Sequence, residues 1–172
     1  ISILSTILRP KAGSVMVGGL DLYRKKRAVR RIIGLVPQEI ALYPMLTTRE
    51  NLRFFGKLQG LKGDRLRERI DETLASVGLT NRADQPVGTF SGGMKRRANL
   101  AAGMLHQPQL LFLDEPTVGI DAQSRQLIME QIETLRDGGT TILYTTHYME
   151  EAQRLCSRVA IMDQGRILIQ GT

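Results

Sequence analysis

Two adjacent carboxylates, Asp114 and Glu115, directly follow the apolar run Leu110–Leu113. A short continuous apolar run is typical of a β-strand that is covered on both faces. It therefore places both acids at the carboxyl end of a buried strand, where open α/β sheets bind ligands. One carboxylate there could hold Mg²⁺ through water while the second polarises an attacking water. A strand that simply ends in a polar turn would leave the same pattern.

A second group, Ser91, Gly92 and Gly93, lies about twenty residues upstream at the start of an expected helix. Free backbone N–H groups and the helix dipole make such a helix end suited to anions, and the glycines permit close approach. By itself a glycine pair marks only a turn. Its position between a serine cap and a helix, ahead of an Asp-Glu strand end, favours the anion-binding interpretation.

Three further polar residues follow expected strands or precede expected helices. His147 comes directly after the strand at 141–145, so we expect it at the same sheet edge, where it could touch a phosphate. Gln38 follows the strand at 32–36, and its amide could coordinate Mg²⁺ or the attacking water. Asp121 can cap the helix after it, which is its default role. His106, near the end of a helix before Pro108, is interpreted as a helix-end residue.

The periodicity predicts strands that alternate with helices in most of the chain. Strands are expected at residues 14–17, 32–36, 110–113, 141–145, 159–162 and 166–169, and helices at 47–60 (opened by a capping box), 64–78 (capped by Asp64), 91–107, 122–136 and 148–156. This alternation predicts an α/β fold with a parallel sheet and helices on both faces. Residues 40–106 lack the alternation. They are interpreted as a helical subdomain inserted between core segments 1–39 and 107–172.

Composition excludes few classes of function. With 42% hydrophobic and 24% charged residues the chain is typical of a globular domain, and it has no apolar run long enough to span a membrane and no signal-peptide pattern. The lone Cys156 cannot form an internal disulfide. Residues 1–62 hold 12 basic and 3 acidic side chains, with the densest cluster at Arg24–Arg31. Such a cluster can meet phosphate, nucleic acid or anionic lipid, but more often it is a solvated face.

In this order and spacing the motifs resemble those of the ATPase subunits of ABC transporters over essentially the whole chain. Ser91-Gly92-Gly93 resembles the signature loop, although Phe90 stands where leucine is usual. Asp114 and Glu115 resemble the Walker B acids, Gln38 the Q-loop, Asp121 the D-loop and His147 the switch histidine. The stretches VPQEIALYPMLTTRENLRFFGKL, SGGMKRR and TTHYMEEAQRLCSRVAIMDQGRI are most similar to the subfamily of drug and ABC-2 type exporters.

The resemblance implies a P-loop NTPase (RecA-like) fold, with ATP and Mg²⁺ as cofactors. It implies that Glu115 is the general base or polarises water, that Asp114 holds Mg²⁺ through water and that His147 stabilises the γ-phosphate. Gln38 would link the metal site to a transmembrane permease partner. Ser91, Gly92, Gly93 and Asp121 would act on the ATP of a second cassette, arranged head to tail. The expected location is cytoplasmic, peripheral on the inner face of the cell membrane.

One element of the family pattern is absent. The sequence contains no Gly-Lys-Ser or Gly-Lys-Thr, so the Walker A loop that cradles the β- and γ-phosphates is missing. The family pattern would place this loop immediately before Ile1, and we expect Ile1–Leu8 to be the rest of the helix that it begins. The strand feeding the loop would lie between the strands at 141–145 and 159–162. Its absence should leave a gap there or force those strands to re-pair.

Three hypotheses follow. The first is an ATPase subunit of an exporter, of which the 172 residues alone are expected to be inactive. The second is a non-catalytic remnant that acts as an interaction module, and it is compatible with the first. The third, a soluble cassette protein acting on nucleic acid, is disfavoured because such proteins usually pair two cassettes in one chain. No nucleic-acid partner is therefore expected.

Overall fold

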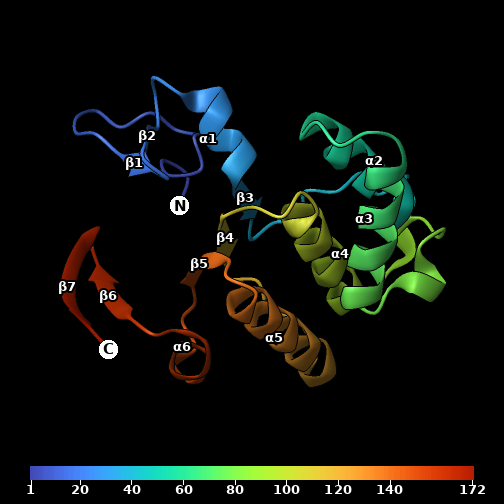
Figure 1. Cartoon of the computed structure of the whole chain (residues 1–172). Coiled ribbons are helices and arrows are strands. Elements are labelled where there is room, and N and C mark those ends of the chain that lie inside the picture. The colour runs from blue at the N-terminus through green and yellow to red at the C-terminus, as the bar shows by residue number, and fades with distance from the viewer.

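A three-stranded parallel sheet lies at the centre of the structure, a computed structural model that describes residues 1–172 (Figure 1). In chain order the elements are β1 (Met16–Val17), β2 (Leu20–Asp21), α1 (Lys26–Ile32), β3 (Ile33–Val36), α2 (Thr48–Leu58), α3 (Gly63–Ser76), the 3₁₀ turns η1 (Thr80–Arg82) and η2 (Val87–Thr89), α4 (Gly92–Met104), β4 (Leu110–Asp114), α5 (Ala122–Asp137), β5 (Thr141–Thr145), α6 (Met149–Leu155), β6 (Val159–Asp163) and β7 (Arg166–Gly171).

The central sheet has the order β3-β4-β5, with all three strands parallel. Side chains of β4 alternate between two apolar clusters, as the two-residue repeat of a strand requires. Leu111 and Leu113 pack with residues of α4 and α5, such as Ile128. Phe112 packs on the other face with β1, β2 and α1, including Val29. The prediction of an α/β fold with a parallel sheet covered by helices on both faces is confirmed.

Three helices, α2, α3 and α4, fall within residues 40–106. The predicted capping box is present, because Thr47 and Glu50 each accept a hydrogen bond from the other's backbone N–H group. The prediction that Asp64 caps the next helix is wrong, since α3 begins at Gly63 and Asp64 lies in its first turn. A carboxylate in that turn still interacts favourably with the helix dipole. The division into a core and a helical subdomain stays a prediction.

Two expectations for the N-terminal part are wrong. The strand expected at 32–36 begins at Ile33, because the basic residues before it form α1. Lys, Arg and Ala have high helix propensity. Ile1–Leu8 does not continue as a helix: Ser5 N–H bonds to Ile1 O at 2.9 Å, and the chain then turns at Thr6, whose φ is 68°. Serine and the β-branched residues Ile and Thr propagate a helix poorly, and the first turn is costly to form.

The expected hairpin at the C-terminal end is confirmed as an antiparallel pair, β6 and β7. Gln164 and Gly165 form its turn with φ values of 45° and 76°. Strand β5 pairs only with β4, and β6 pairs only with β7, so the expected gap between β5 and β6 is present. In Figure 1 the hairpin lies to one side of the central sheet.

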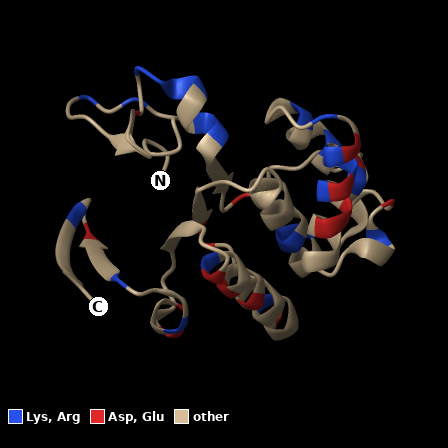
Figure 2. Ribbon diagram, viewed as in Figure 1, with Lys and Arg blue, Asp and Glu red and all other residues tan.

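Basic residues are concentrated on α1 and the turn before it, as Figure 2 shows in blue. No ion pair involves any residue before Arg49, whereas the later helices carry several. The N-terminal cluster therefore keeps its positive charge uncompensated within the chain. None of the helices combines the length and the apolar character needed to cross a bilayer.

Candidate functional site

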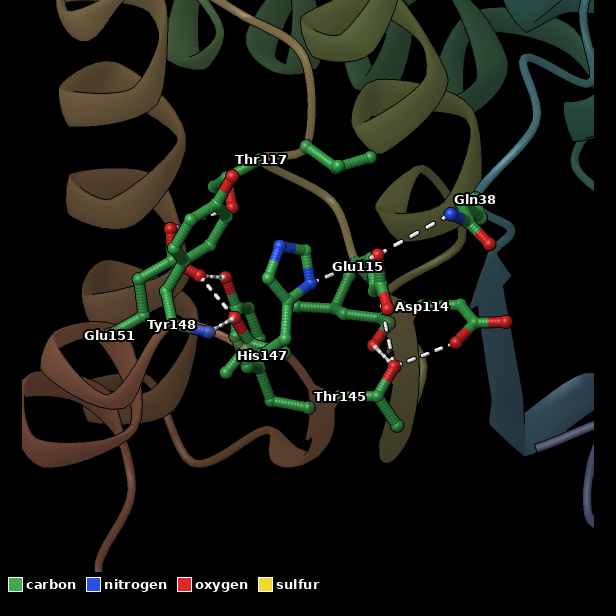
Figure 3. Close-up of polar contacts among 12 residues, drawn as sticks. Gln38, Asp114, Glu115, Thr117, Thr145, His147, Tyr148 and Glu151 are labelled. Carbon is green, nitrogen blue, oxygen red and sulfur yellow. Dashed lines mark hydrogen bonds and ion pairs between the residues drawn. The ribbon is translucent and has the colours of Figure 1, made fainter.

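The predicted site residues lie where the three parallel strands end. Gln38 follows β3, Asp114 and Glu115 end β4, and His147 follows β5 (Figure 3). The strands are in register, with Asp114 beside Thr145, so their carboxyl ends meet at one edge. The alternation of strands and helices thus brings together polar groups from distant parts of the sequence.

Glu115 is the centre of this group. Its Oε2 accepts a hydrogen bond from Gln38 Nε2 at 3.3 Å and lies 3.4 Å from His147 Nδ1. The Glu115 side chain is 29% exposed and that of His147 is 54% exposed, so a ligand from solvent can reach both. The backbone of Glu115 has a φ of 46°, an uncommon value for a residue other than glycine. This conformation persists because Glu115 N–H is bonded to Thr145 O at 3.1 Å.

Asp114 has a different environment. Its Oδ1 accepts a short hydrogen bond of 2.6 Å from the hydroxyl of Thr145, which fixes the carboxylate at the end of the strand. Hard oxygen donors of this kind fit Mg²⁺, which usually keeps several waters and takes only one or two protein carboxylates. No group of three or more ionisable side chains that could hold a metal ion occurs. Asp114 therefore fits a magnesium ion held mainly by water and phosphate oxygens.

A second group of predicted residues surrounds the N-termini of α4 and α5. Ser91 caps α4 by accepting a hydrogen bond from Met94 N–H at 3.2 Å. Asp121 caps α5 by accepting one from Ser124 N–H at 2.8 Å, and this contact lowers the pKa of Asp121. Both capping predictions are confirmed.

The two helix ends touch at a glycine. A Cβ on Gly93 would lie 1.9 Å from Ser124 Oγ and 2.8 Å from Asp121 Oδ2, so only glycine fits there. On Gly92 a Cβ would have no contact closer than 3.9 Å, to Gly119 O. Gly93 thus has a packing role, while Gly92 leaves the backbone open to a ligand.

The structure separates these two groups. No hydrogen bond links Ser91, Gly92, Gly93 or Asp121 to the cluster around Glu115. The connection is made by two residues of α4 that the sequence analysis did not single out, Arg96 and Asn99.

Arg96 and Asn99 hold the segment that carries Gln38. Arg96 Nη1 donates to the backbone carbonyl of Gln38, and its Nη2 donates to Val118 O at 3.5 Å. Burial lowers the pKa of Arg96, and the charge of Glu115 acts against that shift. Asn99, only 2% exposed, donates to Pro37 O and accepts from Ala41 N–H, both at 3.1 Å. The detectable sequence signal was a polar Asn99 beside the apolar positions of the helix.

His106 is placed as expected, just beyond the end of α4. Its Nε2 lies 2.9 Å from Ile33 O, and burial lowers the pKa of the ring. It belongs to the packing between α4 and β3 and lies outside the polar cluster around Glu115.

Comparison with known proteins gives consistent results. A family model described as ABC transporter matches residues 1–118. The chain is 49% identical over all its residues to the linearmycin resistance ATP-binding protein LnrL of Bacillus subtilis and 48% identical to the daunorubicin resistance ATP-binding protein DrrA2 of Streptomyces coeruleorubidus. It covers 55% and 53% of those proteins, so the chain spans about half the length of the curated relatives it matches.

Solved structures agree with this assignment of the fold. A structure described as the ATP binding subunit of an ABC transporter aligns with a TM-score of 0.88 and 27% identity, over 99% of this chain and 71% of that one. The ATP-binding cassette MJ0796, in a dimeric post-hydrolysis state with ADP and Pi, aligns with a TM-score of 0.87 over 99% of this chain and 77% of that one. At 23% identity the second match shows the fold alone.

Proposed function

Because this chain belongs to the ABC transporter family, we propose that it is part of an ATP-binding and ATP-hydrolysing subunit of a drug or ABC-2 type exporter. The observation that carries the proposal is the placement of the Glu115 carboxylate between Gln38 and His147 at the ends of three parallel strands. The names of the two relatives, which refer to linearmycin and daunorubicin resistance, support the exporter subtype. The subunit would act in the cytoplasm, on the inner face of the membrane, and drive transport through a transmembrane permease.

Each side chain has a role that its contacts support. Glu115 accepts hydrogen bonds at an exposed carboxylate, which is what a residue that orients or deprotonates water requires. His147 presents a ring N–H donor beside it, suited to a terminal phosphate oxygen. Asp114 would hold Mg²⁺ through water, and the ion would neutralise phosphate charge. Gln38 would transmit the state of this cluster toward the permease.

The separate group at the N-termini of α4 and α5 supports a dimer. Ser91, Gly92 and Gly93 present backbone N–H groups that do not point at this chain's own Glu115 cluster. A second cassette, placed head to tail, would bring its ATP to these groups and to Asp121. Charge stabilisation by positioned donors would then supply most of the rate enhancement.

ATP hydrolysis by purified protein tests the proposal. The 172 residues contain no Gly-Lys-Ser or Gly-Lys-Thr, so we expect negligible turnover and at best millimolar affinity for nucleotide from them alone. Joining them to a segment that supplies G-x-x-x-x-G-K-[ST] and its strand should restore turnover. In that protein Glu115→Gln should abolish turnover and leave ATP binding intact. Turnover by the 172 residues alone that is sensitive to Glu115→Gln would overturn the first expectation.

The alternative is a non-catalytic cassette that acts as an interaction module. The open edge of β5 and the separate hairpin favour it, because they leave unpaired backbone groups beside the site. It predicts that the extended protein still fails to hydrolyse ATP while it dimerises or binds a permease. The same assay, combined with a measurement of oligomeric state, distinguishes the two functions.

A further inference from the structure

A buried carboxylate lies next to the site and has no role in the chemistry proposed above. Glu151, on α6, is only 2% exposed. Its Oε1 accepts a hydrogen bond from Thr117 Oγ1 at 2.7 Å. Its Oε2 accepts from Tyr144 OH and from Thr146 Oγ1, both at 2.8 Å (Figure 3). Three hydroxyl groups thus converge on one buried acid.

The three donors belong to the segments that carry the polar cluster. Thr117 follows Glu115 by two residues, in the loop after β4. Thr146 immediately precedes His147, and Tyr144 lies in the last turn of β5 before it. Glu151 therefore ties together the two loops from which Glu115 and His147 project.

The hydroxyl of Thr146 passes this constraint to the other side of His147. Each hydroxyl has a single proton, and that of Thr146 is used toward Glu151. Its oxygen then accepts from Tyr148 N–H at 3.0 Å. His147 is held between Thr146 and Tyr148, so the position of its ring depends on the carboxylate four residues later.

Stability alone gives no reason for an acid at this position. Taking a carboxylate out of water is costly, and an apolar side chain of similar volume is often as good or better for stability. No close ion pair compensates Glu151, since Arg125 Nε lies 3.8 Å from Oε1 while its guanidinium stacks over the Tyr148 ring at 4.8 Å. Burial raises the pKa of Tyr144 far above its usual range, so its hydroxyl remains a donor. The hydrogen bonds of the acid are spent on the two loops.

We propose that Glu151 is a positioning residue that sets the placement of His147 relative to Glu115 through the hydroxyls of Thr117 and Thr146. The proposal rests on the proposed function only for the use of the Glu115–His147 pair on a phosphate. The placement itself is a property of this chain and can be measured without nucleotide.

The test uses NMR on the 172-residue chain, which contains only two histidines, His106 and His147. The His147 ring signal is identified by its loss in His147→Asn. The observable is the shift of that signal caused by Glu115→Gln, which reports the contact between the two side chains at 3.4 Å. In Glu151→Leu, and in the nearly isosteric Thr146→Val, this shift should fall to roughly half or less, as expected when two side chains share one network. Glu151→Gln, which keeps one acceptor oxygen, should be intermediate.

Glu133→Gln is the matched control. Glu133 is also a hydrogen-bonded glutamate that contacts α6, through Arg154, but it touches neither loop. It should lower stability and leave the His147 response unchanged. If Glu151→Leu does not fold, Thr146→Val and Glu151→Gln still decide the question. A His147 response equal to that of the unchanged chain in both variants would overturn the proposal, whatever happens to thermal stability.

Failure of the proposed function would be seen separately. If the extended protein lacks ATPase activity while the His147 response depends on Glu151, the positioning role stands and the proposed enzymatic function fails. If turnover is restored and the response does not depend on Glu151, only the positioning role is overturned.

Discussion

The guanidinium of Arg96 donates a hydrogen bond to the backbone carbonyl of Gln38, a residue 58 positions earlier in the chain. Its other terminal nitrogen reaches Val118 O, three residues after Glu115. Helix α4, whose N-terminus carries the signature-like loop, is thereby connected to both the Gln38 segment and the loop after β4. This contact joins the two groups of predicted site residues, which have no direct hydrogen bond to each other.

Replacing Arg96 should disturb Gln38 specifically. Arg96→Met leaves the Gln38 and Val118 carbonyls without their donor, and Arg96→Lys restores only one contact because an ammonium lacks the planar fork. We expect the side-chain amide signal of Gln38 in an NMR spectrum to shift in both variants, more in the first. Arg97→Met is the control, since Arg97 bonds to the carbonyls of Val77 and Gly78 instead. An equal shift in the Arg97 variant would contradict this prediction.

Asn99 should be important for stability. Asn99→Leu keeps the volume but removes the partners of Pro37 O and Ala41 N–H, so we expect a loss of about 2 kcal/mol in the free energy of unfolding. Urea titration measures the loss, and hydrogen exchange should show a faster Ala41 amide. Asn81→Leu, at an exposed position, should change the free energy little. Similar effects of the two substitutions would count against a special role for the Asn99 contacts.

The two signature-like glycines should respond differently to alanine. Gly93→Ala drives a methyl group into Ser124 Oγ and should cost about 1–3 kcal/mol of stability through forced repacking. Gly92→Ala meets nothing closer than 3.9 Å and should be nearly neutral for stability. Thermal or urea unfolding of both variants tests this. Adding Ser124→Gly to Gly93→Ala should recover part of the loss, and no recovery would show that the clash is not the cause.

Acid should weaken the contact between α5 and α6. The hydrogen bond from Arg154 lowers the pKa of Glu133 below its ordinary value of 4.5. Because the folded-state pKa is the lower one, the stabilisation is fully present above the unfolded-state pKa and is lost as the pH falls through the folded-state value. We expect Glu133→Gln to reduce the slope of unfolding free energy against pH below about 4.5. Glu68→Gln, which removes an exposed carboxylate with no hydrogen bond, should leave that slope nearly unchanged.

Local interactions are the part of the fold that the sequence predicted well. The caps at Thr47, Ser91 and Asp121 each join residues three positions apart, so the pattern of residue types is enough to find them. The strand Leu110–Asp114 was found for a similar reason, since burial on both faces demands an uninterrupted apolar run. Helix α1 was missed because its basic residues have no apolar stripe long enough to reveal a helical period.

The sequence by itself determined which chemical groups are present and that strand ends would bring several of them to one edge. Only the tertiary structure decided how they meet. Glu115 and Gln38 are 77 residues apart, and Glu151 reaches Thr117 across 34. Such contacts depend on the packing of whole helices against the sheet, and no periodicity in the sequence encodes the angle or depth of that packing. For the same reason the partners of Arg96 and Glu151 became visible only in the folded chain.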